Sequence, residues 1–329
     1  MVETPSSPKR PKIGLALGSG VARGWAHLGV LRALERYGFR PDVIAGTSIG
    51  AMVGGAYLAG HAEDLEDWAR DLTKVGVMSY LDFRVRAAGM IGGRHLVEAM
   101  EQHFAGVRIE DLDRPFVAVA ADLVTGHEVW LRDGDLIQSM RASFSLPGVF
   151  EPMKLGNRWL VDGALVNPVP VSVCQALGAE LVVAVNVNAD QLGKTRRRGM
   201  DVPSIAGFDL LREIDKGGGA AAGSKLGALT RRVFRRETNR PSMFGVMTSA
   251  LGIVQDRITR SRLAGEPPDV HITPRLGHVG LFEFDRAEEI IAEGEAAVER
   301  ALPDLRDGLA IFDRELGENG NGQGNNGKG

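Results

Sequence analysis

The sequence predicts an α/β protein in which a mainly parallel sheet is covered by helices on both faces. Short apolar runs of strand length alternate with segments of helical spacing through the first half of the chain. The runs are apolar at nearly every position, which is typical of strands buried on both faces of a parallel sheet. This alternation favours parallel neighbours joined by helical crossovers.

The expected strands are short apolar runs bounded by turn residues or by helices. In chain order they are Ile13–Leu17, Asp42–Ala45, Phe116–Ala121, Glu128–Leu131, Trp159–Val161, Leu181–Val187 and Val270–Thr273. The expected helices have apolar residues three or four positions apart, or many small residues that allow close packing on a sheet. They are Trp25–Tyr37, Ile49–Ala59, Leu136–Phe144, Val171–Leu177, Met243–Leu263 and Ala287–Leu302.

Composition narrows the class of protein. The 329 residues are 44% hydrophobic and 25% charged, which is ordinary for a globular protein. No apolar run reaches the roughly 18 residues of a membrane span, and the polar, proline-containing start at Met1–Lys12 does not resemble a signal peptide. The single cysteine, Cys174, excludes an intrachain disulfide and favours a cytoplasmic location. A net charge of −3 gives no reason to expect a nucleic-acid partner.

We expect one domain over residues 12–313, with a motif core at 13–188, between disordered tails at 1–11 and 314–329. The segment 194–240 differs from the rest, because it holds twelve basic and five acidic residues and a run of glycines. One interpretation is a solvated, mobile insertion. The other is a basic amphipathic patch that contacts an anionic membrane surface, at the inner membrane of the cell.

A Gly-x-Ser-x-Gly pattern runs from Gly46 to Gly50 and places Ser48 between an expected strand and an expected helix. This is the strand–turn–helix setting of a nucleophile elbow, whose strained backbone tolerates only small neighbours. The hydroxyl of Ser48 would lie at the positive end of the following helix. The alternative is that Ser48 only caps that helix.

A glycine-containing loop follows the first strand and opens the first helix. Its candidate residues are Gly18, Ser19, Gly20, Val21, Arg23 and Gly24. A dinucleotide-type phosphate turn is one interpretation, but Arg23 replaces its last glycine and the acid expected after the second strand is missing. The other is an oxyanion hole made of backbone N–H groups, with positive charge from Arg23. The loop and the elbow should meet, since parallel strands end at one edge of a sheet.

Asp162 ends the strand Trp159–Val161 and is followed by Gly163 and Ala164. An Asp-Gly pair is usually only a turn, as we expect at Asp133-Gly134. The position between an apolar strand and a new helix distinguishes Asp162 as a candidate.

These three motifs, in this order, resemble those of the patatin-like phospholipase family. The stretch Gly20–Leu31 is most similar to its bacterial branch related to neuropathy target esterase, and Ser143–Pro152 is also family-like. The resemblance covers about 13–188, with a further similar block at 243–286. It implies a three-layer patatin-like fold.

The resemblance also implies a function. Ser48 would be the nucleophile and Asp162 the general base of a dyad, and Arg23 with the backbone of Ser19–Val21 would form the oxyanion hole. The protein would be a lipid acyl hydrolase that acts on phospholipids, lysophospholipids or related acyl lipids through an acyl-enzyme, without metal or cofactor. Ser19 and Val21 depart from the four-glycine run of many members, so the loop would be stiffer.

Two alternatives stay open. An α/β-hydrolase-type esterase would use a Ser–Asp–His triad, for which His271 or His278 is in the right chain order. A non-catalytic lipid- or nucleotide-binding module could keep the same fold. Residues 61–110 include apolar side chains, Trp68 among them, that either cover the cleft or belong to the core.

Overall fold

The computed structural model describes residues 10–72, 105–190 and 243–321. An eight-stranded sheet lies at its centre, in the order β5-β6-β3-β2-β1-β7-β8, with β4 paired to β3. The strands are β1 (Ile13–Leu17), β2 (Val43–Thr47), β3 (Phe116–Asp122), β4 (Glu128–Leu131), β5 (Met153–Leu155), β6 (Arg158–Asp162), β7 (Leu181–Val185) and β8 (Val270–Ile272). The run from β3 through β2, β1 and β7 to β8 is parallel, and β4, β5 and β6 pair antiparallel. The predicted α/β class with a mainly parallel sheet is confirmed.

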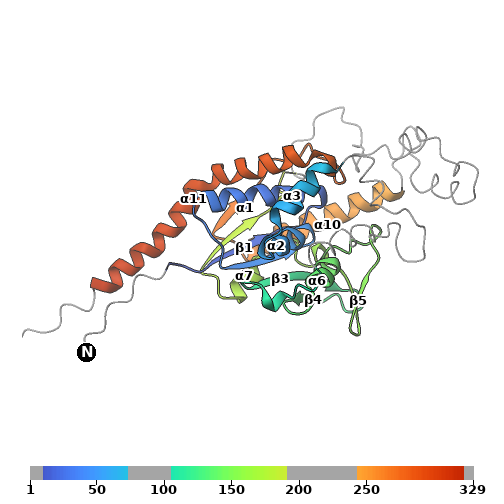
Figure 1. Ribbon diagram of the computed structural model, residues 1–329, viewed down its shortest axis with the longest axis horizontal. Helices are drawn as coiled ribbons and strands as arrows, with labels where there is room; N and C mark the ends of the chain where they lie inside the picture. Colours follow the sequence, from blue (N-terminus) through green and yellow to red (C-terminus); the bar gives the residue numbers. More distant parts are fainter. Residues whose placement is uncertain (1–9, 73–104, 191–242, 322–329) are drawn as a thin grey trace, which may run out of the picture.

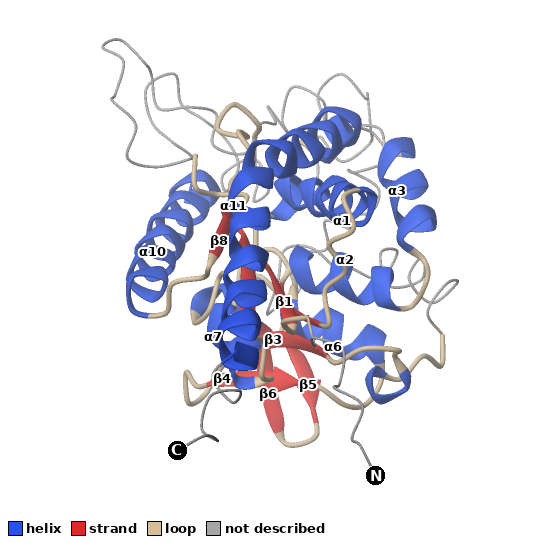
Figure 2. Ribbon diagram, turned by 90° about the vertical axis from the view of Figure 1, so that its left-hand side faces the viewer, coloured by secondary structure: helices blue, strands red, loops and turns tan. Residues whose placement is uncertain are grey.

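Helices cover both faces of this sheet (Figures 1 and 2). On one side lie α1 (Ala26–Arg36), α2 (Ile49–Leu58), α3 (Ala62–Asp71) and α11 (Ala287–Asn321). On the other lies α7 (Val171–Ala176), and α10 (Met243–Gly265) contributes Leu263 to the same apolar cluster. The short α6 (Leu136–Ser143) packs on β3, β5 and β6.

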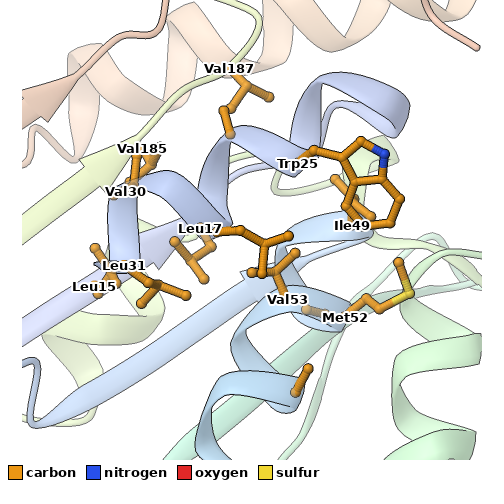
Figure 3. Close-up of a cluster of buried hydrophobic side chains, with 14 of the residues drawn as sticks. Leu15, Leu17, Trp25, Val30, Leu31, Ile49, Met52, Val53, Val185 and Val187 are labelled. Carbon is orange, nitrogen blue, oxygen red and sulfur yellow. The ribbon is translucent and has the colours of Figure 1, made fainter. Parts of the chain in front are cut away.

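The alternation of side chains along β1 builds both cores. Leu15 and Leu17 point into the larger cluster, together with Trp25, Ile49 and other apolar side chains (Figure 3). Ala16, between them, points into the smaller cluster beneath α7. Strand β1 is therefore apolar throughout because it has a core on both sides.

The structure differs from the sequence prediction in several elements. It adds α3 and β5, which the sequence analysis did not foresee, and extends the last helix from the expected Leu302 to Asn321, into the expected tail. Arg10, placed in the expected N-terminal tail, is ion-paired with Asp42 at 2.7 Å. The insertion 194–240, residues 73–104 of the expected cleft cover, and the chain ends 1–9 and 322–329 lie outside the described residues. Among the helices that are described, none has the length and apolar character needed to cross a bilayer.

Candidate active site

Strand β3 brings the elbow and the candidate aspartate together. Thr47, at the end of β2, pairs with Val119 of β3, and Asp162, at the end of β6, pairs with the next residue, Ala120. Since β4 occupies the other edge of β3 at these positions, β2 and β6 share one edge and meet end to end. Ser48 Oγ donates a hydrogen bond of 2.7 Å to Asp162 Oδ2, although the two residues are 114 positions apart.

Ser48 has a strained backbone. Its φ of 58° and ψ of −122° lie in a region that residues other than glycine rarely adopt. The N–H of Ser48 donates to Ser143 Oγ at 2.8 Å, and its carbonyl accepts from the N–H groups of Ala51 and Met52, where α2 begins. Such strain, of order 1–3 kcal/mol, persists only when neighbouring groups fix the conformation. The turn therefore holds the hydroxyl of a 6%-exposed side chain against Asp162.

Asp162 is a buried carboxyl group with few partners. Burial raises the pKa of Asp162 to about 7, and hydrogen bonds from the Ala164 N–H and the Ser48 hydroxyl oppose that rise. The Ala164 N–H lies 2.8 Å from Oδ1, so the other oxygen, Oδ2, faces Ser48. A carboxylate with a pKa near neutrality can take a proton from a neighbouring hydroxyl far better than one in water.

The glycine loop presents only part of its backbone to the site. The N–H groups of Gly18 and Ser19 donate to Val185 O and Pro168 O, at 3.0 and 2.8 Å. Within the described part of the chain, the N–H groups of Gly20 and Val21 have no acceptor. Val21 lines the cavity beside Ser48 and has a φ of 51°, which is strained for a β-branched residue. Of the four amides from Gly18 to Val21, those of Gly20 and Val21 are therefore the two that could donate to a substrate oxygen.

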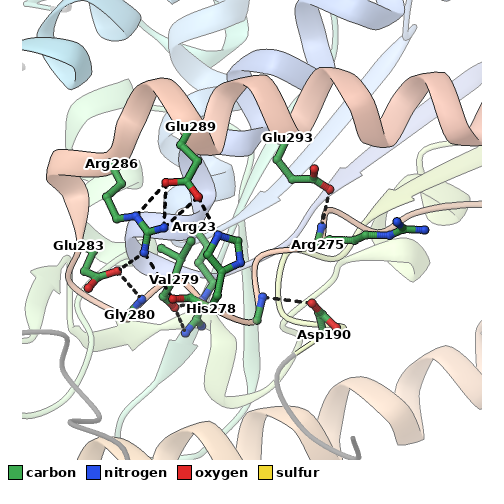
Figure 4. Close-up of polar contacts among 11 residues, drawn as sticks. Arg23, Asp190, Arg275, His278, Val279, Gly280, Glu283, Arg286, Glu289 and Glu293 are labelled. Atoms are coloured by element: carbon green, nitrogen blue, oxygen red, sulfur yellow. Dashed lines mark hydrogen bonds and ion pairs between the residues drawn. The ribbon is translucent and has the colours of Figure 1, made fainter.

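The side chain of Arg23 is engaged elsewhere (Figure 4). Its Nε and Nη2 donate to Val279 O at 3.0 and 2.8 Å, and its Nη1 donates to Asn188 Oδ1 at 3.0 Å. Asn188 in turn donates to Ser19 O at 2.8 Å. Burial lowers the pKa of Arg23 to about 10, and Glu283 opposes that shift. The guanidinium therefore ties the glycine loop to the segment that follows β8.

We expect Arg23→Lys to lower the free energy of unfolding by about 1.5–3 kcal/mol, the range for a lost hydrogen bond of a charged group. Lysine keeps the charge but cannot bridge Val279 O and Asn188 in the same geometry. Urea unfolding measures this loss. Arg32→Lys is the matched control, because Arg32 forms surface ion pairs at 43% exposure and should change stability by less than about 1 kcal/mol. An Arg23→Lys variant that unfolds with the same free energy as the wild type would contradict a structural role for the hydrogen bonds of the Arg23 guanidinium.

An apolar cavity adjoins the pair. Ser48 and Asp162 are the only hydroxyl or ionisable side chains among its described lining residues. The others are Val21, Trp25, Ile49, Met52, Trp68, Leu72, Phe144, Leu146, Val149, Phe150, Phe282 and Phe284. Trp25 meets Trp68 and Phe284 edge to face, with ring centroids 5.8 and 5.9 Å apart. The cavity suits a hydrocarbon chain whose polar end reaches Ser48.

The described histidines do not complete a triad with Ser48 and Asp162. His278 Nε2 contacts Glu289 Oε1 at 2.7 Å (Figure 4), and His271 lines a separate cavity with Asp190 and Arg300. His27 Nε2 contacts Gly18 O at 2.7 Å, and burial lowers the pKa of His27 to about 4. Among the described residues, no histidine is bonded to Asp162. The triad alternative with His271 or His278 is therefore not supported.

The sequence analysis assigned no role to Ser143 or Ser145. The structure places both beside the pair, since Ser143 Oγ accepts the Ser48 N–H at 2.8 Å and Ser145 O accepts the Asp162 N–H at 3.0 Å. The one signal that could have found them is their position in the family-like stretch Ser143–Pro152.

A parallel sheet that presents a strained serine to a buried carboxyl group beside an apolar cavity is typical of serine hydrolases. The chain belongs to the patatin-like phospholipase family, whose model matches residues 15–174. An uncharacterized NTE family protein of Mycobacterium tuberculosis is 32% identical over 329 residues, covering 89% of this chain and 91% of that protein.

Two animal relatives match a shorter part. Patatin-like phospholipase domain-containing protein 7 of Rattus norvegicus is 34% identical over 184 residues, which is 54% of this chain and 14% of that protein. Neuropathy target esterase sws of Drosophila melanogaster is 32% identical over 184 residues, 54% of this chain and 13% of that protein. Among solved structures, VipD from Legionella pneumophila aligns with a TM-score of 0.47 at 12% identity, over 91% of this chain and 67% of that one.

Proposed function

We propose that this protein is a serine lipid acyl hydrolase that cleaves carboxyl esters of phospholipids, lysophospholipids or related acyl lipids. The observation that carries the proposal is the 2.7 Å hydrogen bond from Ser48 Oγ to Asp162 Oδ2 at the wall of an apolar cavity. Membership of the patatin-like phospholipase family supports the lipid class of substrate.

The geometry supports a two-step mechanism. Asp162 takes the proton of Ser48 as Oγ attacks the ester carbonyl carbon, and the negative charge that develops on the carbonyl oxygen is stabilised by the N–H groups of Gly20 and Val21. The C–O bond then breaks, the leaving alcohol receives the proton from Asp162, and the acyl group stays on Ser48. Water then attacks the acyl carbon with Asp162 again as base, the bond to Ser48 Oγ breaks as Oγ takes the proton back from Asp162, and the fatty acid leaves.

The cavity determines how the substrate lies. Its apolar lining accommodates an acyl chain, whereas a charged head group would lose its hydration there without a compensating partner. The head group therefore stays outside the cavity. Contact between segment 194–240 and an anionic membrane, and a cytoplasmic location, stay predictions of the sequence.

A fluorophosphonate probe and a panel of defined lipids test the proposal. The wild type should be labelled and should release fatty acid from at least one ester, and Ser48→Ala should show neither reaction at equal folding. Ser172→Ala is a control, because Ser172 lies in α7 and outside the cavity lining. Lipid binding without labelling would instead favour the non-catalytic module.

A further inference from the structure

The buried hydroxyl of Ser143 lies between the backbone of Ser48 and strand β3. Ser143 is the last residue of α6, and its side chain is fully buried. Its Oγ accepts the Ser48 N–H at 2.8 Å and donates to Val119 O at 2.6 Å. Because Val119 is also the residue that pairs with Thr47, the hydroxyl continues the contact between β2 and β3 one residue further, at the point where the chain turns away from the sheet.

This contact matters because the Ser48 backbone is strained. Beyond Thr47 the pairing of β2 with β3 ends, and the next position on β3, Ala120, pairs with Asp162. Without Ser143 the N–H of Ser48 would be buried and unpaired, which costs about 1–3 kcal/mol. The simplest relief is a rotation of the turn, and such a rotation would move Oγ away from Asp162.

The same short segment also contacts the backbone of Asp162, the proposed general base. Ser145, two residues on, accepts the Asp162 N–H at 3.0 Å through its carbonyl, and its own hydroxyl donates to Arg141 O at 2.7 Å. Phe144 lies between the two serines, lines the cavity and packs edge to face on Phe150 with centroids 5.4 Å apart. The segment 143–145 thus contacts the backbones of both members of the pair.

We propose that Ser143 is a positioning residue that fixes the strained Ser48 turn through the hydroxyl bridge from the Ser48 N–H to Val119 O. This rests on the proposed hydrolase function. Ser143 is not a catalytic residue, because both hydrogen bonds of its hydroxyl are used within the protein. Its loss should therefore slow the attack by Ser48 without changing substrate affinity or the pH at which Asp162 ionises.

The test compares two isosteres at the site with a matched serine on the same helix. Ser143→Thr keeps the hydroxyl, and Ser143→Val has the shape of the threonine variant without the hydroxyl. Ser139→Ala removes another buried α6 hydroxyl, one that only donates to Asp135 O at 2.9 Å. We measure kcat, KM and the pH midpoint with a short-chain ester, the rate of fluorophosphonate labelling, and urea unfolding.

We expect Ser143→Val to lose about 10- to 100-fold in kcat and in labelling rate, as small displacements at reacting groups do, with KM and the pH midpoint unchanged. Ser143→Thr should stay at least about tenfold faster than Ser143→Val, and Ser139→Ala within about twofold of the wild type. Equal rates for the threonine and valine variants would overturn the proposal, and so would an equal loss in Ser139→Ala. Labelling needs no knowledge of the lipid, so absent lipid turnover with normal labelling would count against the proposed substrate and not against Ser143.

Discussion

Replacing Asp162 with asparagine should abolish most turnover while making the folded protein more stable at alkaline pH. Asparagine has the same shape, and its oxygen can still accept the Ala164 N–H that lies 2.8 Å from Oδ1. It cannot take a proton from Ser48, and the loss of a general base lowers kcat by about 10²- to 10⁴-fold. Hydrolysis of a short-chain ester by the two proteins measures this loss.

The gain in stability follows from burial. Burial raises the pKa of Asp162 to about 7 in the folded protein, whereas the unfolded chain ionises near pH 4. The folded state therefore holds the proton more tightly, and its stability falls as pH rises from about 4 to about 7. Three pKa units correspond to at most about 4 kcal/mol. Asparagine never ionises, so the variant should be more stable by up to that amount at pH 8, and by less as pH falls.

Two measurements check this argument. Urea unfolding between pH 4.5 and 8.5 should show a difference between the two proteins that grows with pH and levels off above about 7. The kcat/KM of the wild type should fall about tenfold per pH unit below 7, because the base must be ionised. His278→Asn serves as the control and should leave the kcat/KM profile unchanged, since His278 contacts Glu289 and does not line the cavity. Lower stability of Asp162→Asn at pH 8, or turnover near that of the wild type, would contradict the assignment.

The sequence predicts the parallel sheet well, because burial on both faces makes strands such as β1 and β7 apolar throughout. The Ser48–Asp162 pair is predictable as a hypothesis because each residue follows an apolar strand. The sequence does not predict that β2 and β6 meet end to end on β3. Hydrophobic periodicity indicates which face of a sheet a residue occupies, but it does not indicate which strand lies beside it. That register alone places Asp162 beside Ser48.

Arg23 shows the limit of local reasoning. Because Arg23 lies in a glycine loop, the sequence predicts that its positive charge stabilises the oxyanion. Its guanidinium instead donates to Val279 O, which lies 256 positions away. The acceptor is a backbone carbonyl, and no sequence pattern marks one. Helix α3 was missed for a different reason, because its apolar positions Leu65, Trp68 and Ala69 are few among charged residues. In the structure that face packs on the larger core cluster, and Trp68 also lines the cavity.

Gly50→Ala should impair both folding and catalysis, and a second glycine of α2 isolates the cause. A Cβ at Gly50 would lie 2.2 Å from Leu17 O and 2.8 Å from Gly18 O. Both are backbone atoms, at the end of β1 and the start of the glycine loop, so the first turn of α2 must move away from them. Overpacking of this kind lowers the free energy of unfolding by about 1–3 kcal/mol.

The same movement separates Ser48 from the Gly20–Val21 amides, because Ser48 immediately precedes α2. We expect kcat to fall by about 100-fold, the effect of a displacement near 1 Å. Gly55→Ala adds the same methyl group to the same helix, but there it meets the flexible side chain of Met140, 2.9 Å from Sδ. The higher helix propensity of alanine, about 1 kcal/mol, offsets that contact.

The control variant should therefore unfold within about 1 kcal/mol of the wild type and keep kcat within about threefold. Urea unfolding and ester turnover of both variants decide the matter. If Gly50→Ala turned over substrate as fast as Gly55→Ala, the distance between the elbow and the glycine loop would not limit the rate, and the Gly20–Val21 amides would lose their assigned role. A selective loss in Gly50→Ala would instead mean that the spacing of these two strand ends controls the reaction, because both variants add the same methyl group to the same helix.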